Sequence, residues 1–165
     1  MLILKITDNN GMYGWGEVWC NFPLTGAEHR AKLIDNVFKP LLANFDIITP
    51  EKTYEYLVSK TKILSIQSGE PGPIAQCIAG IDIAIHDLIG KVENISLWKK
   101  FGGNKNIIPC YASGINPTKP VLTVKDAIKK GYSSFKLKIG FGLKKDLGNI
   151  KAVSYTHLRA HETNS

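Results

Sequence analysis

The feature that most constrains this chain is the segment 74–90, which is apolar on nearly every side when it is drawn as a helix. A helix of that kind has no face suited to water, so other elements must cover it. No apolar run reaches the roughly 18 residues that a membrane-spanning helix needs, and a membrane protein is therefore not expected. The sequence predicts a globular fold around a helix whose apolar residues include Ile78, Ile81, Ile83, Ala84, Ile85, Leu88 and Ile89.

A β-hairpin is predicted at the start of the chain. Residues 2–6 and 13–19 are rich in β-branched, apolar and aromatic types, and the turn sequence Asp-Asn-Asn-Gly at 8–11 lies between them. The first strand begins almost at Met1, with no basic segment followed by an apolar one, so a signal peptide is not expected.

Two helices should follow the hairpin. Thr25 and Glu28 have the spacing of a capping box, and the helix that they open should stop at Pro40. Thr49 precedes a proline and a glutamate, which is typical of a second helix start. A loop over 68–73 should then lead into the buried helix, which makes this part of the chain α+β.

Strands and helices alternate after residue 103, which indicates a parallel sheet. We expect an N-terminal α+β domain over 1–105 and the first part of an α/β domain over 106–152. The predicted elements of the second part are strands at 107–112 and 135–139 and helices at 124–130 and 145–152.

The last residues, 153–165, are set aside from the fold prediction. Residues 153–163 resemble, residue for residue, one reading frame of a widely used transposase sequencing adapter. We therefore expect 153–165 to be a non-native tail and 1–152 to be the biological sequence.

Net charge and cysteine spacing argue against some classes of function. The formal net charge is +7, but the lysine pairs are scattered and have no aromatic residues between them, so nucleic-acid binding is not expected. The cysteines Cys20, Cys77 and Cys110 have neither zinc-site nor disulfide spacing, which favours a reducing, cytoplasmic location.

Lys136 and Lys138 are the strongest candidates for chemistry. In a strand they project to one side, with backbones about 7 Å apart, while Phe135, Leu137 and Ile139 should pack beneath a helix layer. Like charge and desolvation would both lower a lysine pKa and so produce a base that works near neutral pH. Spacing alone favours the alternative, an edge strand with solvated lysines.

Other candidates have simpler interpretations. Gly14-x-Gly16 is not a phosphate loop, because no helix follows it. Gly140-Phe141-Gly142 precedes a helix and could host an anion. Asp82 and Asp87 lie five residues apart on the central helix, so core hydrogen bonding or capping is favoured over a metal site. His86 is expected to be a packed histidine.

Three motifs together resemble the mandelate racemase/muconate-lactonizing branch of the enolase superfamily. They are the hairpin sequence 14–17 (Gly-Trp-Gly-Glu), the helix sequence 79–91 followed by Phe101-Gly102-Gly103, and the strand sequence 135–142, which contains the Lys-x-Lys pair.

The resemblance implies an α+β capping domain followed by the first strands and helices of a truncated (β/α) TIM-type barrel. It implies an enzyme that removes the α-proton of a carboxylate and holds the enolate with Mg²⁺. Carried over by position, Lys138 would be the base, and Lys136 would lower its pKa and contact the substrate carboxylate. Trp19, Asn21 and Phe22 would lie in a segment that closes over substrate. A sugar-acid dehydratase or racemase, or a lactone cycloisomerase, is favoured, in a parent protein that is a homo-oligomer.

The same resemblance predicts an incomplete chain. The family's first strand should precede Met1, and its three carboxylate metal ligands should follow Ala152, so the chain should bind no catalytic metal and should be inactive. Two alternatives stay open: a small basic α/β binding protein without catalysis, and a dipeptide epimerase or muconate cycloisomerase of the same superfamily.

Overall fold

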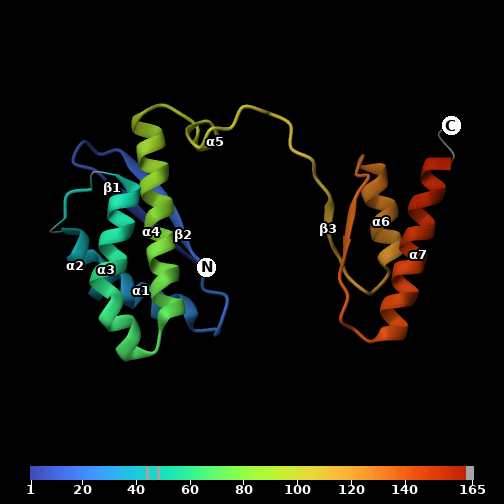
Figure 1. Ribbon diagram of the computed structural model, residues 1–165, viewed down its shortest axis with the longest axis horizontal. Helices are drawn as coiled ribbons and strands as arrows, with labels where there is room; N and C mark the ends of the chain where they lie inside the picture. Colours follow the sequence, from blue (N-terminus) through green and yellow to red (C-terminus); the bar gives the residue numbers. More distant parts are fainter. Residues whose placement is uncertain (44, 48, 163–165) are drawn as a thin grey trace. The chain divides into compact units, whose positions relative to one another are not determined.

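The structure is a computed structural model that describes residues 1–43, 45–47 and 49–162, with side chains described as far as Thr156. The chain divides into two compact units, Met1–Asn104 and Lys105–Ser165, and each is described by itself. Figure 1 shows the elements of both units in chain order.

Unit 1 begins with the predicted hairpin. Strand β1 (Leu2–Thr7) pairs antiparallel with β2 (Tyr13–Val18), in a register that places Leu2 opposite Val18 and Thr7 opposite Tyr13. The Asp8 carboxylate accepts hydrogen bonds from the backbone N–H groups of Asn10 and Met12, at 2.9 and 2.8 Å, and so closes the turn. The hairpin prediction is confirmed.

The segment after the hairpin differs from the prediction in two ways. Helix α1 (Gly26–Leu33) has Thr25 as its N-cap residue, but the Thr25 side chain makes no capping hydrogen bond, so the predicted capping box is absent. The helix also does not stop at Pro40. A π-helical turn, η1 (Ile34–Phe38), joins α1 to α2 (Lys39–Ala43), and the Lys39 N–H bonds to the Ile34 carbonyl five residues back. The wider turn lets the helix continue past a residue that has no N–H.

Two long helices complete this unit, with the short α5 (Leu97–Lys100) after them. Helix α3 (Pro50–Ser68) starts as predicted, because the Thr49 hydroxyl accepts a hydrogen bond from the Lys52 N–H at 3.2 Å. Helix α4 (Pro71–Val92) begins three residues before the predicted start at Ile74. Pro71 and Pro73 lie in its first turn, where backbone N–H groups need no helical partner.

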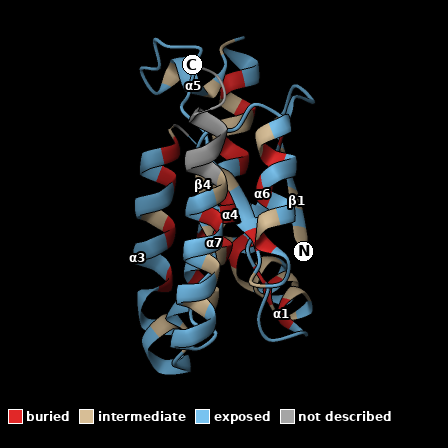
Figure 2. Ribbon diagram, turned by 90° about the vertical axis from the view of Figure 1, so that its right-hand side faces the viewer, coloured by how far each residue is buried: buried red, intermediate tan, exposed pale blue. Residues whose placement is uncertain are grey.

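Helix α4 forms the centre of unit 1, as predicted, but Ile83, which was expected to be covered, is 47% exposed. The buried residues of α4 pack with Val18 of β2, Phe38 of η1 and Leu57 of α3, and Figure 2 shows buried residues on α4 and along one side of α3. By length and composition, α4 is also the one helix among the described residues that could cross a membrane. The expectation that no segment reaches that length is wrong, because α4 is longer at both ends than predicted. Packing inside unit 1 accounts for its apolar composition.

Glycines make the close packing of the hairpin on α4 possible. A Cβ atom at Gly16 would lie 1.9 Å from the Gly80 carbonyl oxygen, and a Cβ atom at Gly14 would lie 2.0 Å from that of Ala84. Only glycine allows backbones to approach this closely. The Gly-x-Gly sequence of β2 is therefore a packing motif, in agreement with its exclusion as a phosphate loop.

Unit 2 has the order β3 (Ala112–Ile115), α6 (Pro120–Lys129), β4 (Phe135–Leu137) and α7 (Leu143–Glu162), and the two strands are parallel. The strand predicted at 107–112 is wrong: Ile107 and Ile108 are exposed, and pairing starts where the Ala112 N–H bonds to the Ser134 carbonyl at 2.8 Å. Pro109 has no backbone N–H, so it cannot donate a hydrogen bond that would extend the strand pairing toward residue 107.

The small core of unit 2 contains Ile115, Val124 and Val153, with Phe135 and Leu137 packed against it. Ile139 was expected to pack there too, but it is 64% exposed, because β4 ends two residues before it. Helix α7 runs from the predicted native sequence into the segment that was set aside, and Val153 is the first residue of that segment.

Candidate active site

Lys136 and Lys138 lie on the face of β4 opposite its packed side chains. Phe135 and Leu137 are partly buried, whereas both lysines are exposed. Lys138 is one residue beyond β4, but its N–H still bonds to the Ile115 carbonyl at 3.0 Å and keeps the strand alternation. The Lys136 ammonium lies 6.0 Å from the centre of the Tyr111 ring. Unit 2 thus places the two ammonium groups on one face and leaves them in water.

The loop after β4 is closed by a carboxylate of the chain itself. Gly140 and Gly142 have φ values of +104° and +105°, which favour glycine. The Asp146 carboxylate, in the first turn of α7, accepts the N–H of Gly140 at 2.9 Å and that of Phe141 at 3.2 Å. Two of the donors that an anion in the 140–142 loop would use are therefore already bonded, which disfavours an external anion at this loop.

The described residues contain no group of three or more His, Cys, Asp or Glu side chains that could hold a metal ion. Asp146 is the carboxylate that follows the lysine strand, and its oxygens are bonded to the backbone. These described residues do not fit a magnesium centre.

Trp19 and Phe22 come together on the loop that follows β2. Their ring centres are 6.3 Å apart, and the side chains are 50% and 74% exposed. Asn21 lies between them and is also exposed. The three residues predicted to contact substrate therefore form one exposed surface of unit 1, which is called the 19–24 loop below.

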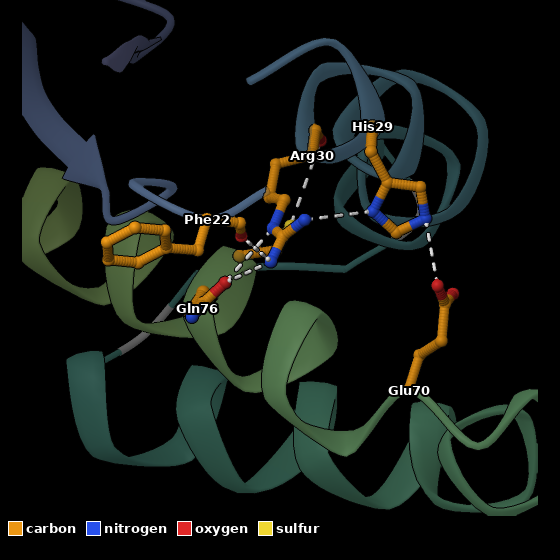
Figure 3. Close-up of polar contacts among 6 residues, drawn as sticks. Phe22, His29, Arg30, Glu70 and Gln76 are labelled. Carbon is orange, nitrogen blue, oxygen red and sulfur yellow. Dashed lines mark hydrogen bonds and ion pairs between the residues drawn. The ribbon is translucent and has the colours of Figure 1, made fainter. Parts of the chain in front are cut away.

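A buried arginine beneath this loop was missed by the sequence analysis. Arg30 is 5% exposed, and its Nε and Nη2 groups donate to the Gln76 side-chain oxygen at 3.0 and 2.8 Å. Nη2 also reaches the Phe22 carbonyl at 3.5 Å, and Nη1 lies 3.3 Å from Nδ1 of His29, as Figure 3 shows. One signal could have found it: Arg30 has the spacing of the apolar stripe Leu33, Ile34, Val37 and Phe38, so it lies on the inward face of α1.

The acidic residues of α4 have structural partners. Asp87 accepts the Lys91 ammonium at 2.7 Å and the Trp15 N–H at 2.8 Å, and these two bonds lower the pKa of its carboxyl group. It therefore ties α4 to the hairpin. Burial raises the pKa of Asp82, which lies 3.9 Å from His86. The His86 ring packs edge-on against Phe101, with ring centres 5.1 Å apart. The predicted hydrogen-bonding role is confirmed for Asp87, and the Phe101 contact agrees with a packed His86, whose Nδ1 is buried without a hydrogen-bond partner among the described residues. The role of Asp82, whose contact is the one with His86, stays a prediction.

Several characterised proteins are similar to this chain. A 3,6-anhydro-alpha-L-galactonate cycloisomerase from Streptomyces coelicolor is 27% identical over 93% of this chain and 42% of its own length. An arabinonate dehydratase from Saccharolobus solfataricus is also 27% identical, over 90% of this chain and 40% of its own length. A hydrophobic dipeptide epimerase from Enterococcus faecalis is 28% identical, over 92% and 41%. The chain thus spans about two fifths of the length of these relatives.

Solved structures agree with these matches. A mandelate racemase/muconate lactonizing enzyme from Bordetella bronchiseptica RB50 is 46% identical, with a TM-score of 0.83 over 89% of this chain and 40% of that one. A racemase from Streptomyces coelicolor with bound magnesium is 27% identical, with a TM-score of 0.79 over 94% of this chain and 46% of that one.

The family assignment follows from the first unit. Residues 1–102 match the N-terminal domain of the mandelate racemase / muconate lactonizing enzyme family. This match covers the hairpin, both long helices and α5, which together have the α+β capping-domain fold. The chain therefore belongs to the mandelate racemase/muconate lactonizing enzyme family of the enolase superfamily.

Proposed function

We propose that residues 1–152 are the first part of a Mg²⁺-dependent enzyme that removes the α-proton of a carboxylate substrate. In this proposal residues 1–105 are the capping domain, 106–152 begin a (β/α) barrel, and 153–165 are an adapter-derived tail. The observation that carries it is the Lys136/Lys138 pair on one face of β4, in a chain whose first unit belongs to this family.

Lys138 is the proposed base. In its neutral form the amine would take the α-proton and become an ammonium group. Lys136, on the same face, would pair with the substrate carboxylate, and its charge would favour the neutral form of Lys138. Both lysines are exposed in unit 2, so the remaining strands of a barrel would have to supply the low-dielectric surroundings that this role needs.

Magnesium is the cofactor that we propose for the complete protein, because a racemase with a similar fold contains it. The described residues do not form such a site. Its ligands would come from other parts of the complete protein, and none is assigned in this chain.

The proposed substrate is a sugar acid or its lactone, used by a dehydratase, racemase or cycloisomerase. The cycloisomerase and the arabinonate dehydratase among the relatives support this class. Trp19, Asn21 and Phe22 would contact the substrate from the capping domain. A dipeptide epimerase is the second candidate, because an enzyme of that kind is equally similar in sequence.

We also propose that the 165-residue chain alone is inactive. A (β/α) barrel takes about 250 residues, and unit 2 comprises only Lys105–Ser165.

Exchange of the α-proton in D₂O, followed by NMR on sugar acids, lactones and dipeptides, tests the proposal with the full-length protein and Mg²⁺. We expect exchange with one of these classes and its loss by about 10²-fold or more in Lys138→Ala. Lys130→Ala, an exposed lysine of the same unit, should exchange normally. Normal exchange in Lys138→Ala, or exchange by the 165-residue chain itself, would overturn the corresponding part of the proposal.

A further inference from the structure

Arg30 carries a positive charge inside unit 1, and no described residue supplies an acidic partner for it. Among the described residues it forms no ion pair, and its contacts are the Gln76 amide oxygen, the His29 ring and the Phe22 carbonyl. Burying a charge against neutral groups is unfavourable, and a leucine at this position would extend the apolar stripe of α1 instead. Core packing therefore gives no reason for an arginine here.

One contact of the Arg30 guanidinium reaches the backbone of the 19–24 loop, and its other contacts are to Gln76 of α4 and His29 of α1. The guanidinium joins Phe22 to Gln76 of α4, and the Arg30 carbonyl lies 3.7 Å from the Cys77 sulfur. The loop also folds tightly onto α1: the Gly26 N–H bonds to the Pro23 carbonyl at 2.8 Å, and a Cβ atom at Gly26 would meet the Cys20 carbonyl oxygen at 2.9 Å. The backbone of the loop is thus held from below, while the rings of Trp19 and Phe22 remain exposed.

His29 and Glu70 together hold the Arg30 side chain in place. The His29 Nδ1 atom can accept from Nη1 of Arg30 only when it carries no proton, so the ring proton of this tautomer lies on Nε2. Nε2 is 3.2 Å from a Glu70 carboxylate oxygen, which can accept that proton. Figure 3 shows the resulting chain of contacts from Glu70 through His29 and Arg30 to Phe22.

We propose that Arg30 is a positioning residue that holds the 19–24 loop in one conformation and thereby sets how tightly the enzyme binds its substrate. The first part concerns this chain alone. The second part rests on the proposed function, in which this loop contacts substrate.

The loop conformation can be measured in the 165-residue chain. Tryptophan would be replaced by 5-fluorotryptophan, and the ¹⁹F signal of Trp19 would be assigned with Trp19→Phe. In Arg30→Met, Arg30→Lys and Gln76→Met we expect the Trp19 signal to shift or broaden, while the Trp15 signal and the helix content stay unchanged. Acrylamide quenching of Trp19, measured in chains where Trp15 and Trp98 are phenylalanine, should rise about twofold.

Thr49→Ala is the matched control, because it weakens α3 of the same unit without touching the loop. It should lower the melting temperature and leave the Trp19 signal unchanged. An unchanged Trp19 signal in all three variants would overturn the proposal. Unfolding of all three under conditions where Thr49→Ala is folded would also overturn it, since Arg30 would then serve stability alone.

The full-length enzyme tests the second part. In Arg30→Lys we expect KM to rise about tenfold with little change in kcat, because the arginine does not touch the reacting atoms. An unchanged KM would refute the role in substrate binding. If the loop responds but no substrate undergoes α-proton exchange, the proposed function fails and the positioning role of Arg30 stands.

Discussion

Two glycines of β2 decide whether the hairpin can lie on α4. Gly16→Ala would place a Cβ atom 1.9 Å from the Gly80 carbonyl oxygen, which belongs to the backbone of α4 and cannot rotate away. We expect the free energy of unfolding of unit 1 to fall by about 3 kcal/mol or more, measured by urea denaturation with circular dichroism. Gly72→Ala is the control: a Cβ atom there meets nothing within 4 Å and alanine suits a helix better than glycine, so stability should not fall. Equal stability of Gly16→Ala and the parent chain would refute this packing.

Asp87 makes a pH-dependent contribution to stability. The Lys91 ammonium and the Trp15 N–H lower its pKa below the ordinary value of 3.8, so its contribution is present above pH 3.8 and is lost as the pH falls through the lowered pKa. Asp87→Asn should lower the free energy of unfolding by about 1 kcal/mol at pH 7, and by less below pH 3.

Urea titrations at both pH values measure this difference. Asp35→Asn is the control, because Asp35 is exposed and has no ion pair among the described residues. A cost for Asp87→Asn that does not depend on pH would contradict the assignment of these contacts.

At the scale of the element, two threonines that were both predicted to begin a helix behave differently. Thr49 has extended backbone angles, and its hydroxyl caps α3, whereas Thr25 has φ −85° and ψ 13° and makes no capping bond. Thr49→Ala should therefore lower the melting temperature of unit 1, at a cost of about 1 kcal/mol, and Thr25→Ala should have little effect. Thermal denaturation of both variants checks this prediction. A larger fall in melting temperature for Thr25→Ala than for Thr49→Ala would contradict it.

The comparison of Thr25 with Thr49 shows why the sequence could predict only part of the fold. Capping residues and apolar periodicity are local signals, and they correctly predicted the hairpin, α3 and the central helix. The angles at Thr25 depend instead on the contact between Gly26 and Pro23, and the continuation past Pro40 depends on the π-turn of η1. Both contacts are local in the chain, but they depend on exact backbone angles that capping residues and apolar periodicity do not specify.

The candidate site, like the fold, could be predicted only in part from the sequence. Lys136 and Lys138 could be placed on one strand face from their spacing alone, because side chains alternate along a strand. Arg30 was missed because its role depends on contacts with Phe22 and Gln76, which belong to other elements and come close to it only in the folded chain. Its roles and those of the lysines remain predictions.

At the scale of the whole molecule, the two units should respond separately to thiol reagents. Cys110 of unit 2 is exposed, while Cys20 and Cys77 are buried in unit 1. Burial also raises the pKa of the Cys77 thiol to about 12, which keeps it in the unreactive thiol form. We expect one fast-reacting thiol per native chain and the loss of this fast phase in Cys110→Ser. Two or three fast thiols would contradict the fold of unit 1.

We expect Cys77 to make the stability of unit 1 fall at alkaline pH. Because the folded pKa of Cys77 is raised above the ordinary value of 9.0, its protonated form stabilises the fold below pH 9, and this contribution is lost as the pH rises toward 12. The free energy of unfolding of unit 1 should therefore fall between pH 9 and 12, as measured by urea denaturation with circular dichroism, and it should depend less on pH in Cys77→Ala. An equal dependence in both would assign alkaline unfolding to other groups.

The central claim is that residues 1–152 begin a longer enzyme of this family, and one continuous read of the source gene through codon 152 tests it most directly. We predict that the reading frame continues into the remaining strands of a barrel and carries Asp and Glu codons at successive strand ends. A read that reproduces residues 153–165 and then a stop codon would contradict the claim, and the function of the chain would then have to be sought in binding.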